Sequence, residues 1–319
     1  MTIDIHAHYH PIAYCEALSK LYGRTVTNFR PHPDTDDPEH IKTRLGQMDE
    51  AGVSVQVLSP AAGHAPYGED ETLAVEAARL INDHNKALVK QHPDRFRSFV
   101  SLPLPHIEAS LAELRRTEGD DGVVGVNLHI SALDRSVAED EFLPIYEEVN
   151  RRKGVIFYHP FGNSICSPMI ADYGFGAAVG TSLEDAVIAL HLIAKQIPSK
   201  YPDITFIIPH LGGPVPMLLP RLNNQFSMQS RGLPEPPADT ACRFYYDTVG
   251  HGSEAALTCA VMAFGAEHVL PGSDYPVLLS WETYKETFDW INRTALSAEV
   301  KDRILNKNVP ALLGLSPGE

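Results

Sequence analysis

The chain of 319 residues is 44% hydrophobic and 21% charged, which is typical of a globular protein with a sizeable core and argues against a disordered chain. Its formal net charge of −15 argues against nucleic acid or an anionic membrane surface as a partner, because such a protein repels phosphate groups. The length suits one large barrel, so residues 1–319 are expected to form a single domain.

Short β-branched runs alternate with longer segments of helical period along the whole chain. This rhythm predicts parallel strands joined by helical crossovers, and eight such strands favour a closed barrel. A doubly wound open sheet is the alternative, but no G-x-G-x-x-G motif follows a strand to support it. The expected strands are Thr2–His6, Ser54–Leu58, Phe96–Ser101, Val123–Leu128, Val155–Tyr158, Thr205–Ile208, Phe244–Asp247 and His268–Leu270.

Two helices have recognisable ends in the sequence. One starts after Asp37, with Pro38 in its first turn, and stops at Gly52. The other is an apolar helix that we expect to begin with Ser182 and Asp185 as a capping box and to end at Pro198. Residues 12–36 and the proline-rich residues 232–239 break the rhythm and are expected to be elaborated barrel loops.

The four cysteines contain no Cys-x-x-Cys pair, which argues against a disulfide scaffold or a zinc ribbon and fits a reducing compartment. They are Cys15, Cys166, Cys242 and Cys259. The first residues lack a basic region followed by a long apolar run, and no stretch of eighteen uncharged apolar residues occurs. We therefore expect a cytoplasmic protein without a membrane partner.

Histidine and aspartate residues stand at the ends of several expected strands. Residues two apart on a strand project from one face, so His6 and His8 can bind one ion together. His159, His210 and Asp274 follow three later strands, and barrel active sites lie where the strands end. A His-x-His pair is common, and a single histidine after a strand is more often structural. Five such residues at four strand ends favour a shared site.

The motifs around these residues are D-I-H-A-H, F-Y-H-P, I-I-P-H-L-G-G and G-S-D-Y-P. They resemble the amidohydrolase superfamily, in particular its branch around aminocarboxymuconate semialdehyde decarboxylase. Gln47–Val53, His92–Phe96 and Pro220–Leu222 are similar to that branch as well, so the resemblance extends from residue 2 to about residue 315. It implies an α/β fold, a (β/α)8 TIM barrel of amidohydrolase type with a small insertion at about residues 12–36.

The resemblance also implies one divalent ion, Zn²⁺ in most members and Mn²⁺ as the alternative, bound by His6, His8, His159 and Asp274. His210 would be the general acid/base, and Asp274 would also take part in catalysis. Neutral imidazoles and a carboxylate suit zinc. A bound ion lowers the pKa of its water, and a nearby His210 can accept or return the proton.

At two positions the sequence departs from some members of the superfamily, and these departures narrow the expected number of metal ions and the expected type of decarboxylase. Binuclear members have a carboxylated lysine after the fourth strand, and residues 122–129 contain no lysine, so a single metal is favoured. His129 could line the pocket or be structural. Some hydroxybenzoate decarboxylases have glutamate where this chain has His6, which moves the comparison towards the semialdehyde and methylsalicylate decarboxylases.

The substrate is expected to be a small carboxylate, for which arginine offers a bidentate fork. Arg221 resembles a family arginine that reaches into the neighbouring subunit's site, which implies a homodimer; the alternative is a surface arginine. Arg30 resembles another substrate-binding arginine. Phe161 and His251 are candidates to contact the substrate, and Tyr9 and Tyr275 could extend an aromatic wall.

Two enzymatic functions remain open from the sequence. The first is non-oxidative decarboxylation of an aromatic or unsaturated carboxylic acid. The second is hydrolysis or hydration of a lactone, ester, amide or unsaturated diacid, since the same water-activating site supports both. A third hypothesis is a non-enzymatic binding protein that has kept the barrel. The presence of all five site residues argues against it.

Overall fold

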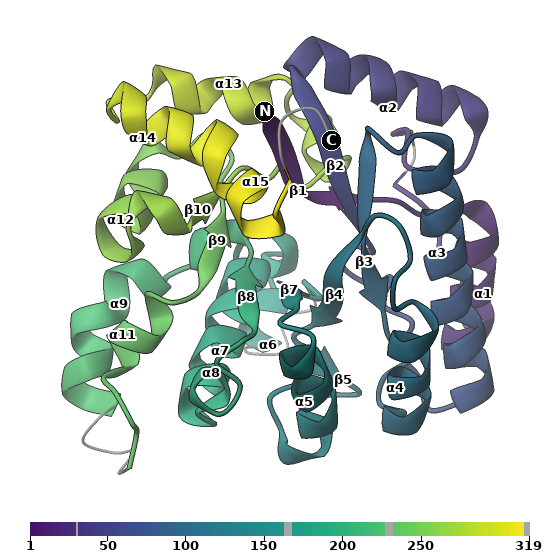
Figure 1. Cartoon of the computed structure of the whole chain (residues 1–319), viewed down its shortest axis with the longest axis horizontal. Coiled ribbons are helices and arrows are strands. Elements are labelled where there is room, and N and C mark those ends of the chain that lie inside the picture. Colours follow the sequence, from purple (N-terminus) through teal and green to yellow (C-terminus); the bar gives the residue numbers. More distant parts are fainter. Residues whose placement is uncertain (30, 163–167, 227–231, 316–319) are drawn as a thin grey trace.

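Eight parallel strands form a barrel at the centre of the molecule, in the order β1-β2-β3-β4-β7-β8-β9-β10 (Figure 1). The structure is a computed structural model that describes residues 1–29, 31–162, 168–226 and 232–315. The strands are β1 (Thr2–His8), β2 (Val53–Ser59), β3 (Phe96–Ser101), β4 (Val123–His129), β7 (Val155–His159), β8 (Thr205–Ile208), β9 (Tyr245–Asp247) and β10 (Val269–Leu270). The predicted (β/α)8 barrel is confirmed, with every strand end within two residues of its expected position.

Helices follow the strands and surround the barrel (Figure 1). The longer ones are α1 (Ile12–Tyr22), α2 (Pro38–Ala51), α3 (Glu71–Gln91), α4 (Ile107–Arg116), α5 (Leu143–Arg151), α7 (Thr181–Ala194), α9 (Val215–Arg221), α12 (Glu254–Phe264) and α13 (Glu286–Arg293). Shorter helices are α6 (Pro168–Ala171), α8 (Ile197–Lys200), α11 (Pro237–Ala241), α14 (Ala298–Asp302) and α15 (Asn308–Leu313). A small hairpin, β5 (Ser131–Ala132) and β6 (Arg135–Ser136), follows β4.

The helix predicted after Asp37 is α2, with the Asp37 side chain accepting a hydrogen bond from the Glu39 amide and Gly52 in the left-handed conformation. The capping box expected at Ser182 and Asp185 is wrong. A π-helical turn, Gly176–Gly180, leads directly into α7, so both residues lie inside the helix, and the Asp185 carboxylate points to His210 instead. The helix also ends before Pro198, at Ala194.

The apolar segment Gly176–Ala194 is long and hydrophobic enough to cross a membrane by length and composition alone, with a mean hydropathy of 1.4. Two fully buried acidic residues, Glu184 and Asp185, lie within it and accept hydrogen bonds from loops at the barrel mouth. The segment therefore packs as a helix of the barrel wall.

A bulge in β1 sets the direction of its histidines. Asp4 pairs with Gln56 and Ala7 with Leu58, so β1 contains one residue more than β2 between these pairs. Ile3 and Ile5 pack in the inner core of the barrel, and the extra residue then turns His6 and His8 inward as well. Ala7 packs in the outer core, between the barrel and the helices.

The barrel closes between β1 and the segment that follows β10. The Ile5 amide donates to the Pro271 carbonyl at 3.0 Å, and the Asp274 amide donates to the His6 carbonyl at 2.9 Å. Buried Asp4 supports this seam by accepting hydrogen bonds from the Ser273 hydroxyl at 2.6 Å and the Tyr284 hydroxyl at 2.8 Å. Burial raises the pKa of Asp4 to about 6, against these hydrogen bonds, which lower it.

A buried arginine supports the seam from outside the barrel. Arg44 of α2 is fully buried, donates to the His8 carbonyl at 2.6 Å and to the Gln56 side chain at 3.1 Å, and lies over the Tyr275 ring at 4.3 Å. Its guanidinium therefore connects β1, β2 and the loop after β10.

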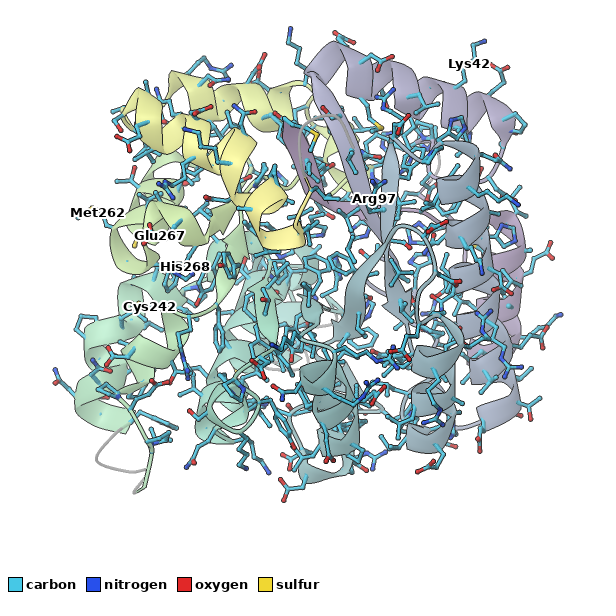
Figure 2. The ribbon with its side chains drawn as sticks, viewed as in Figure 1. Lys42, Arg97, Cys242, Met262, Glu267 and His268 are labelled. Carbon is cyan, nitrogen blue, oxygen red and sulfur yellow. The ribbon has the colours of Figure 1, made fainter. Side chains whose placement is uncertain are left out.

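We predict that Arg44→Met lowers the free energy of unfolding by about 1–3 kcal/mol, because the His8 carbonyl loses its buried donor. Urea unfolding followed by circular dichroism measures the change. Lys42→Met is the matched control on the same helix, since the Lys42 side chain is 77% exposed (Figure 2). Equal stability of the two variants would contradict a structural role for Arg44.

Candidate active site

Four residues expected to share an ion meet at the carboxyl ends of the strands. His6 and His8 lie at the end of β1, His159 is the last residue of β7, and Asp274 follows β10. Each residue offers one potential metal-ligating atom. These four atoms lie within 4.8 Å of one another, and all four residues are buried. His159 faces inward because it continues the alternation of inward-facing Val155 and Phe157.

The hydrogen bonds of the three imidazoles direct one nitrogen of each towards a common point. Nδ1 of His6 bonds to the Asp247 carboxylate at 2.7 Å, Nδ1 of His8 to the Ser59 carbonyl at 3.2 Å, and Nδ1 of His159 to the Pro160 carbonyl at 2.8 Å. Because each of these partners is an acceptor, each Nδ1 carries the proton, and the Nε2 lone pairs remain available.

This arrangement fits a cation. Nε2 of His159 is buried and has no hydrogen-bond partner. Nε2 of His8 lies 3.2 Å from Nε2 of His6 and 2.8 Å from Asp274 Oδ1, so lone pairs face one another unless a positive centre lies between them. Three imidazoles and one carboxylate are a usual ligand set for a divalent transition metal.

The protonation states suit the same ion. Burial lowers the pKa of His8 and of His159, which leaves both imidazoles neutral. Burial raises the pKa of Asp274, but its contacts with His210, His8 and His6 outweigh this effect and hold that pKa well below its usual range. Asp274 is therefore ionised. His6 differs, because the Asp247 charge and hydrogen bond raise its pKa against the effect of burial.

His210 lies beside this cluster and is held by an aspartate of α7. Its Nδ1 bonds to Asp185 Oδ2 at 2.8 Å, its Nε2 lies 3.9 Å from Asp274 Oδ2, and its amide donates to Asp247 Oδ1 at 2.9 Å. Burial lowers the pKa of His210, but the Asp185 charge and hydrogen bond and the Asp274 contact outweigh it, and the pKa lies well above its usual value. The imidazole can thus hold a proton near neutral pH.

A glycine after β8 lets α7 approach closely enough for this contact. Gly213 has φ +55°, and a Cβ there would lie 2.0 Å from the Ser182 carbonyl oxygen. Neighbouring Glu184 of α7 accepts from the amides of Phe161 at 2.6 Å and Gly162 at 2.9 Å. One turn of α7 therefore positions both His210 and the loop after β7.

A cavity of about 910 Å³ opens above the cluster. His159, His210 and Asp274 form its floor, and Phe161 and His251 belong to its wall. His251 has φ +48°, and its ring lies 5.5 Å from the Trp281 ring; burial lowers its pKa.

The aromatic wall expected from Tyr9 and Tyr275 is not present at this cavity. Tyr9 is buried beside Arg44, and the Tyr275 hydroxyl donates to Gln47 at 2.9 Å, so both serve the barrel seam. His129 is structural: its Nε2 bonds to the Ala61 carbonyl at 3.1 Å, and burial lowers its pKa to about 3.

Of the two candidate arginines, only Arg221 belongs to the described residues, and it lies apart from this cavity. Arg221 ends α9 on the surface, away from the cavity walls of its own chain, and makes no ion pair with the described residues. Arg30 lies outside the described residues, although its neighbour Phe29 lines the cavity.

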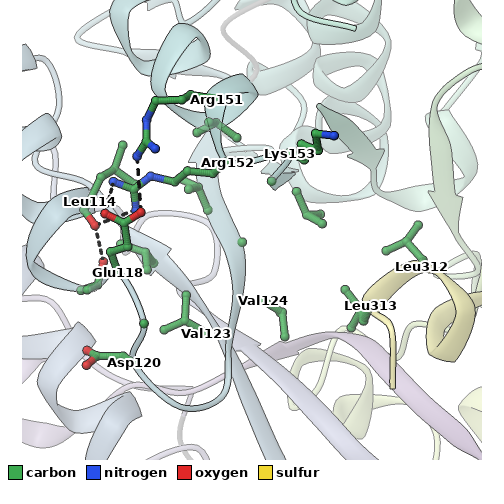
Figure 3. A pocket seen from close by; sticks show the side chains of 18 residues that line it. Leu114, Glu118, Asp120, Val123, Val124, Arg151, Arg152, Lys153, Leu312 and Leu313 are labelled. Atoms are coloured by element: carbon green, nitrogen blue, oxygen red, sulfur yellow. Dashed lines mark hydrogen bonds and ion pairs between the residues drawn. The ribbon is translucent and has the colours of Figure 1, made fainter. Parts of the chain in front are cut away.

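A second cavity, of about 520 Å³, lies at the opposite end of the barrel, where β4 and β7 begin (Figure 3). Arg151 and Arg152 of its wall reach Glu118 at 3.3 and 3.5 Å, so these charges pair within the protein. Functional sites of such barrels occupy the other face. This cavity is a packing feature beneath α15.

Asp185 and Asp247 support the site, although neither was expected among its residues. Asp247 could have been identified from the sequence, because it is the last residue of the expected strand Phe244–Asp247. Asp185 could be interpreted as a capping residue, and its pairing with His210 depends on how closely α7 packs. Burial raises the pKa of Asp185 to about 6, against the His210 charge.

Adding Zn²⁺ or Mn²⁺ to chelator-treated protein should raise the melting temperature, because an ion at 100 times its Kd stabilises the folded state by about 2.7 kcal/mol. Differential scanning calorimetry measures the shift. His159→Ala should abolish most of it. His191→Ala is the matched control, since that imidazole bonds to Ser136 on the surface and should leave the shift intact. A full shift in His159→Ala would argue against this site.

Comparisons with known proteins agree with the fold and identify the family. The family model described as amidohydrolase matches residues 3–315. The 2-amino-3-carboxymuconate-6-semialdehyde decarboxylase of Dictyostelium discoideum is 25% identical over 89% of this chain and 78% of its own length. The gamma-resorcylate decarboxylase of a Polaromonas species is 28% identical over 85% of this chain and 89% of its own length.

A solved structure has the same fold. The dihydroxybenzoic acid decarboxylase from Polaromonas, solved with bound manganese and an inhibitor, superposes with a TM-score of 0.80 and 24% identity. The superposition covers 99% of this chain and 98% of that chain. With its barrel, its buried histidine–aspartate cluster and a match across nearly its whole length, this chain belongs to the amidohydrolase family.

Proposed function

We propose that this protein is a metal-dependent, non-oxidative decarboxylase of aromatic carboxylic acids. The observation that carries the proposal is the position of His210: its imidazole is paired with Asp185 and lies beside Asp274 at the floor of a largely apolar cavity. Both curated relatives compared above are named decarboxylases, which supports this chemistry for the shared site.

His6, His8, His159 and Asp274 would hold the ion, and we propose Zn²⁺ with Mn²⁺ as the alternative. The ion supplies positive charge that orients the substrate's oxygen atoms and stabilises negative charge as it develops on the ring. Asp247 keeps the His6 ring in the required tautomer through the bond to Nδ1.

His210 supplies the proton that replaces the carboxyl group. The bond between the ring carbon and the carboxylate breaks, carbon dioxide leaves, and the electron pair that remains on the ring carbon takes a proton from Nε2 of the imidazolium. Asp185 stabilises that imidazolium through Nδ1. Asp274, 3.9 Å from the same Nε2, is placed to relay a proton back to it.

The hydrolase or hydratase alternative needs the same residues but a different electrophile. It is the less supported of the two, because both relatives have names that describe loss of a carboxyl group. Release of carbon dioxide from an aromatic acid, set against ring opening of a lactone, distinguishes the two functions directly.

Phe161 and His251 would contact the substrate from the cavity wall. Arg221 and Arg30 would bind the substrate's carboxylate, Arg221 from the second subunit of a homodimer in the cytoplasm. The support for a dimer is the exposed apolar surface beside the cavity and α9. Its side chains are Met169, Tyr173, Phe175, Val179 and Met217.

We predict that His210→Ala retains the metal but lowers kcat by about 10²–10⁴-fold, as expected for loss of an acid/base group. Carbon dioxide release from substituted salicylates and dihydroxybenzoates measures kcat, and elemental analysis measures the metal. Asp274→Ala should lose both metal and turnover. His191→Ala is the control, and wild-type turnover in His210→Ala would refute the assigned role.

A mixing experiment tests the homodimer and Arg221 together. Arg221→Ala and His210→Ala should each be nearly inactive, and co-folding of the two should restore part of the turnover, since a mixed dimer has one site with both residues. Arg243→Ala in place of Arg221→Ala is the control, because Arg243 pairs with Glu235 on the surface. If co-folding restores nothing, Arg221 does not act across subunits.

A further inference from the structure

Three buried ionisable side chains form a second cluster beside the cavity, separate from the candidate metal ligands. They are His10, which follows β1, Asp34 of the loop before α2, and His64 of the loop after β2. The centres of the two imidazole rings lie 4.2 Å apart, and Nδ1 of His10 lies 3.0 Å from Asp34 Oδ2. We call these three residues the His64 group. The proposed chemistry does not use them, so their burial needs another explanation.

Within the His64 group, His10 is neutral and Asp34 is ionised. Nε2 of His10 accepts a hydrogen bond from the Ala61 amide at 3.1 Å, so its ring proton is on Nδ1, which donates to Asp34. The Phe29 amide and the Asn28 side chain donate to the same carboxylate at 3.0 and 2.8 Å. Burial raises the pKa of Asp34, but these contacts outweigh it and lower that pKa to about 2.

His64 faces a carbonyl oxygen with each of its ring nitrogens. Nδ1 lies 3.0 Å from the Ala62 carbonyl oxygen, and Nε2 lies 3.0 Å from the Thr27 carbonyl oxygen. Because a carbonyl oxygen only accepts, both hydrogen bonds form only when both nitrogens carry a proton, as in an imidazolium. Asp34, which His10 connects to His64, supplies the negative charge that a buried cation requires.

Two other ionisable side chains lie beside this group, and both are uncharged near neutral pH. Burial lowers the pKa of His129 of β4 to about 3. The Tyr14 hydroxyl of α1 donates to the His64 carbonyl at 2.5 Å, and burial raises its pKa well above the usual value. Asp34 is therefore the charge that these contacts offer to an imidazolium at His64.

The bridge made by His64 joins two segments that line the cavity. Ala62 and Phe29 both belong to the cavity wall. His64 connects the Ala62 carbonyl to that of Thr27, two residues before Phe29. The Phe29 ring also packs against the rings of His64 and His10, with centroids 5.5 and 5.4 Å apart. The place of Phe29 in the wall thus depends on the His64 group.

We propose that His64 is a positioning residue that, when doubly protonated, fixes Phe29 in the cavity wall and so increases the affinity for the substrate. This inference rests on the proposed decarboxylation and assigns His64 no contact with the substrate. A neutral imidazole has a single donor, so loss of one proton turns a lone pair towards a carbonyl oxygen and breaks the bridge. Affinity should therefore fall as the pH rises and His64 loses that proton.

The first test separates KM from kcat for carbon dioxide release from a 2-hydroxybenzoate. His64→Leu should raise KM by about tenfold and leave kcat near that of the wild type, because a charge-assisted hydrogen bond that shapes the binding wall is lost. His64→Gln has a side-chain amide that can donate to the Thr27 carbonyl and should recover most of the affinity. His191→Leu is the matched control on the surface and should change neither value. A wild-type KM in His64→Leu would overturn the proposal.

A double-mutant cycle tests whether His64 acts through Phe29. In a Phe29→Ala background, His64→Leu should raise KM by less than about twofold, because the ring that it positions is already absent. A tenfold rise in that background would show that His64 acts elsewhere. Circular dichroism and metal content check that each variant is folded and loaded.

The protonation state of His64 is tested in the wild-type protein. Nuclear magnetic resonance of the zinc-loaded protein with ¹⁵N-labelled histidine shows which ring nitrogens carry hydrogen between about pH 6 and 9. Comparison with His64→Gln identifies the His64 signals among the fifteen histidines. The second ring proton should be lost over the same pH interval in which KM rises, and His64→Gln should lack that rise. A single ring proton on His64 throughout, or the same KM profile in both proteins, would refute the proposal.

Failure of this inference is distinguishable from failure of the proposed function. Carbon dioxide release with an unchanged KM in His64→Leu overturns the role of His64 alone. Absence of carbon dioxide release from every acid refutes the decarboxylation, and the positioning role that rests on it is then overturned as well.

Discussion

The candidate site depends on closure of the barrel between β1 and the segment after β10. The Asp274 amide donates to the His6 carbonyl, and the Asp274 carboxylate lies 2.8 Å from His8 Nε2, so one short backbone contact brings together residues far apart in the chain. Behind it, Asp4 and Arg44 occupy fully buried positions with several hydrogen bonds each. An open sheet could present the histidines of β1 but would leave the fourth candidate ligand out of reach.

Three residues at the mouth of the barrel have strained backbone conformations. His210, His251 and Asp274 have φ values of +51°, +48° and +54°, a conformation that costs non-glycine residues about 1–3 kcal/mol each. Asp247 offsets part of that cost, because its carboxylate accepts from the amides of His210 and Val249 and from the His6 ring. A single buried carboxylate thus fixes both the candidate acid/base and a candidate ligand.

The sequence predicts the barrel and the five-residue cluster because both follow from short periodic signals. Strand alternation places His159 inward, and the position after each strand places His210 and Asp274 at one end of the barrel. The bulge in β1 cannot be predicted this way, because it exists only in relation to the register of β2. The role of Asp185 could not be predicted either. The local sequence favours Asp185 as a helix-capping residue, and its contact with His210 arises because α7 packs closely on Gly213.

The net charge of the whole protein affects where an anionic substrate is attracted. A chain of net charge −15 repels anions in general, so a carboxylate substrate is attracted where positive charge is concentrated locally, as at the candidate ion and His210. Apolar walls strengthen that attraction, because a less polar surrounding screens charge less than water does. Loss of carbon dioxide turns the anion into a neutral arene. The product no longer gains from the positive floor, and the chemistry itself thereby weakens the interaction that bound the substrate.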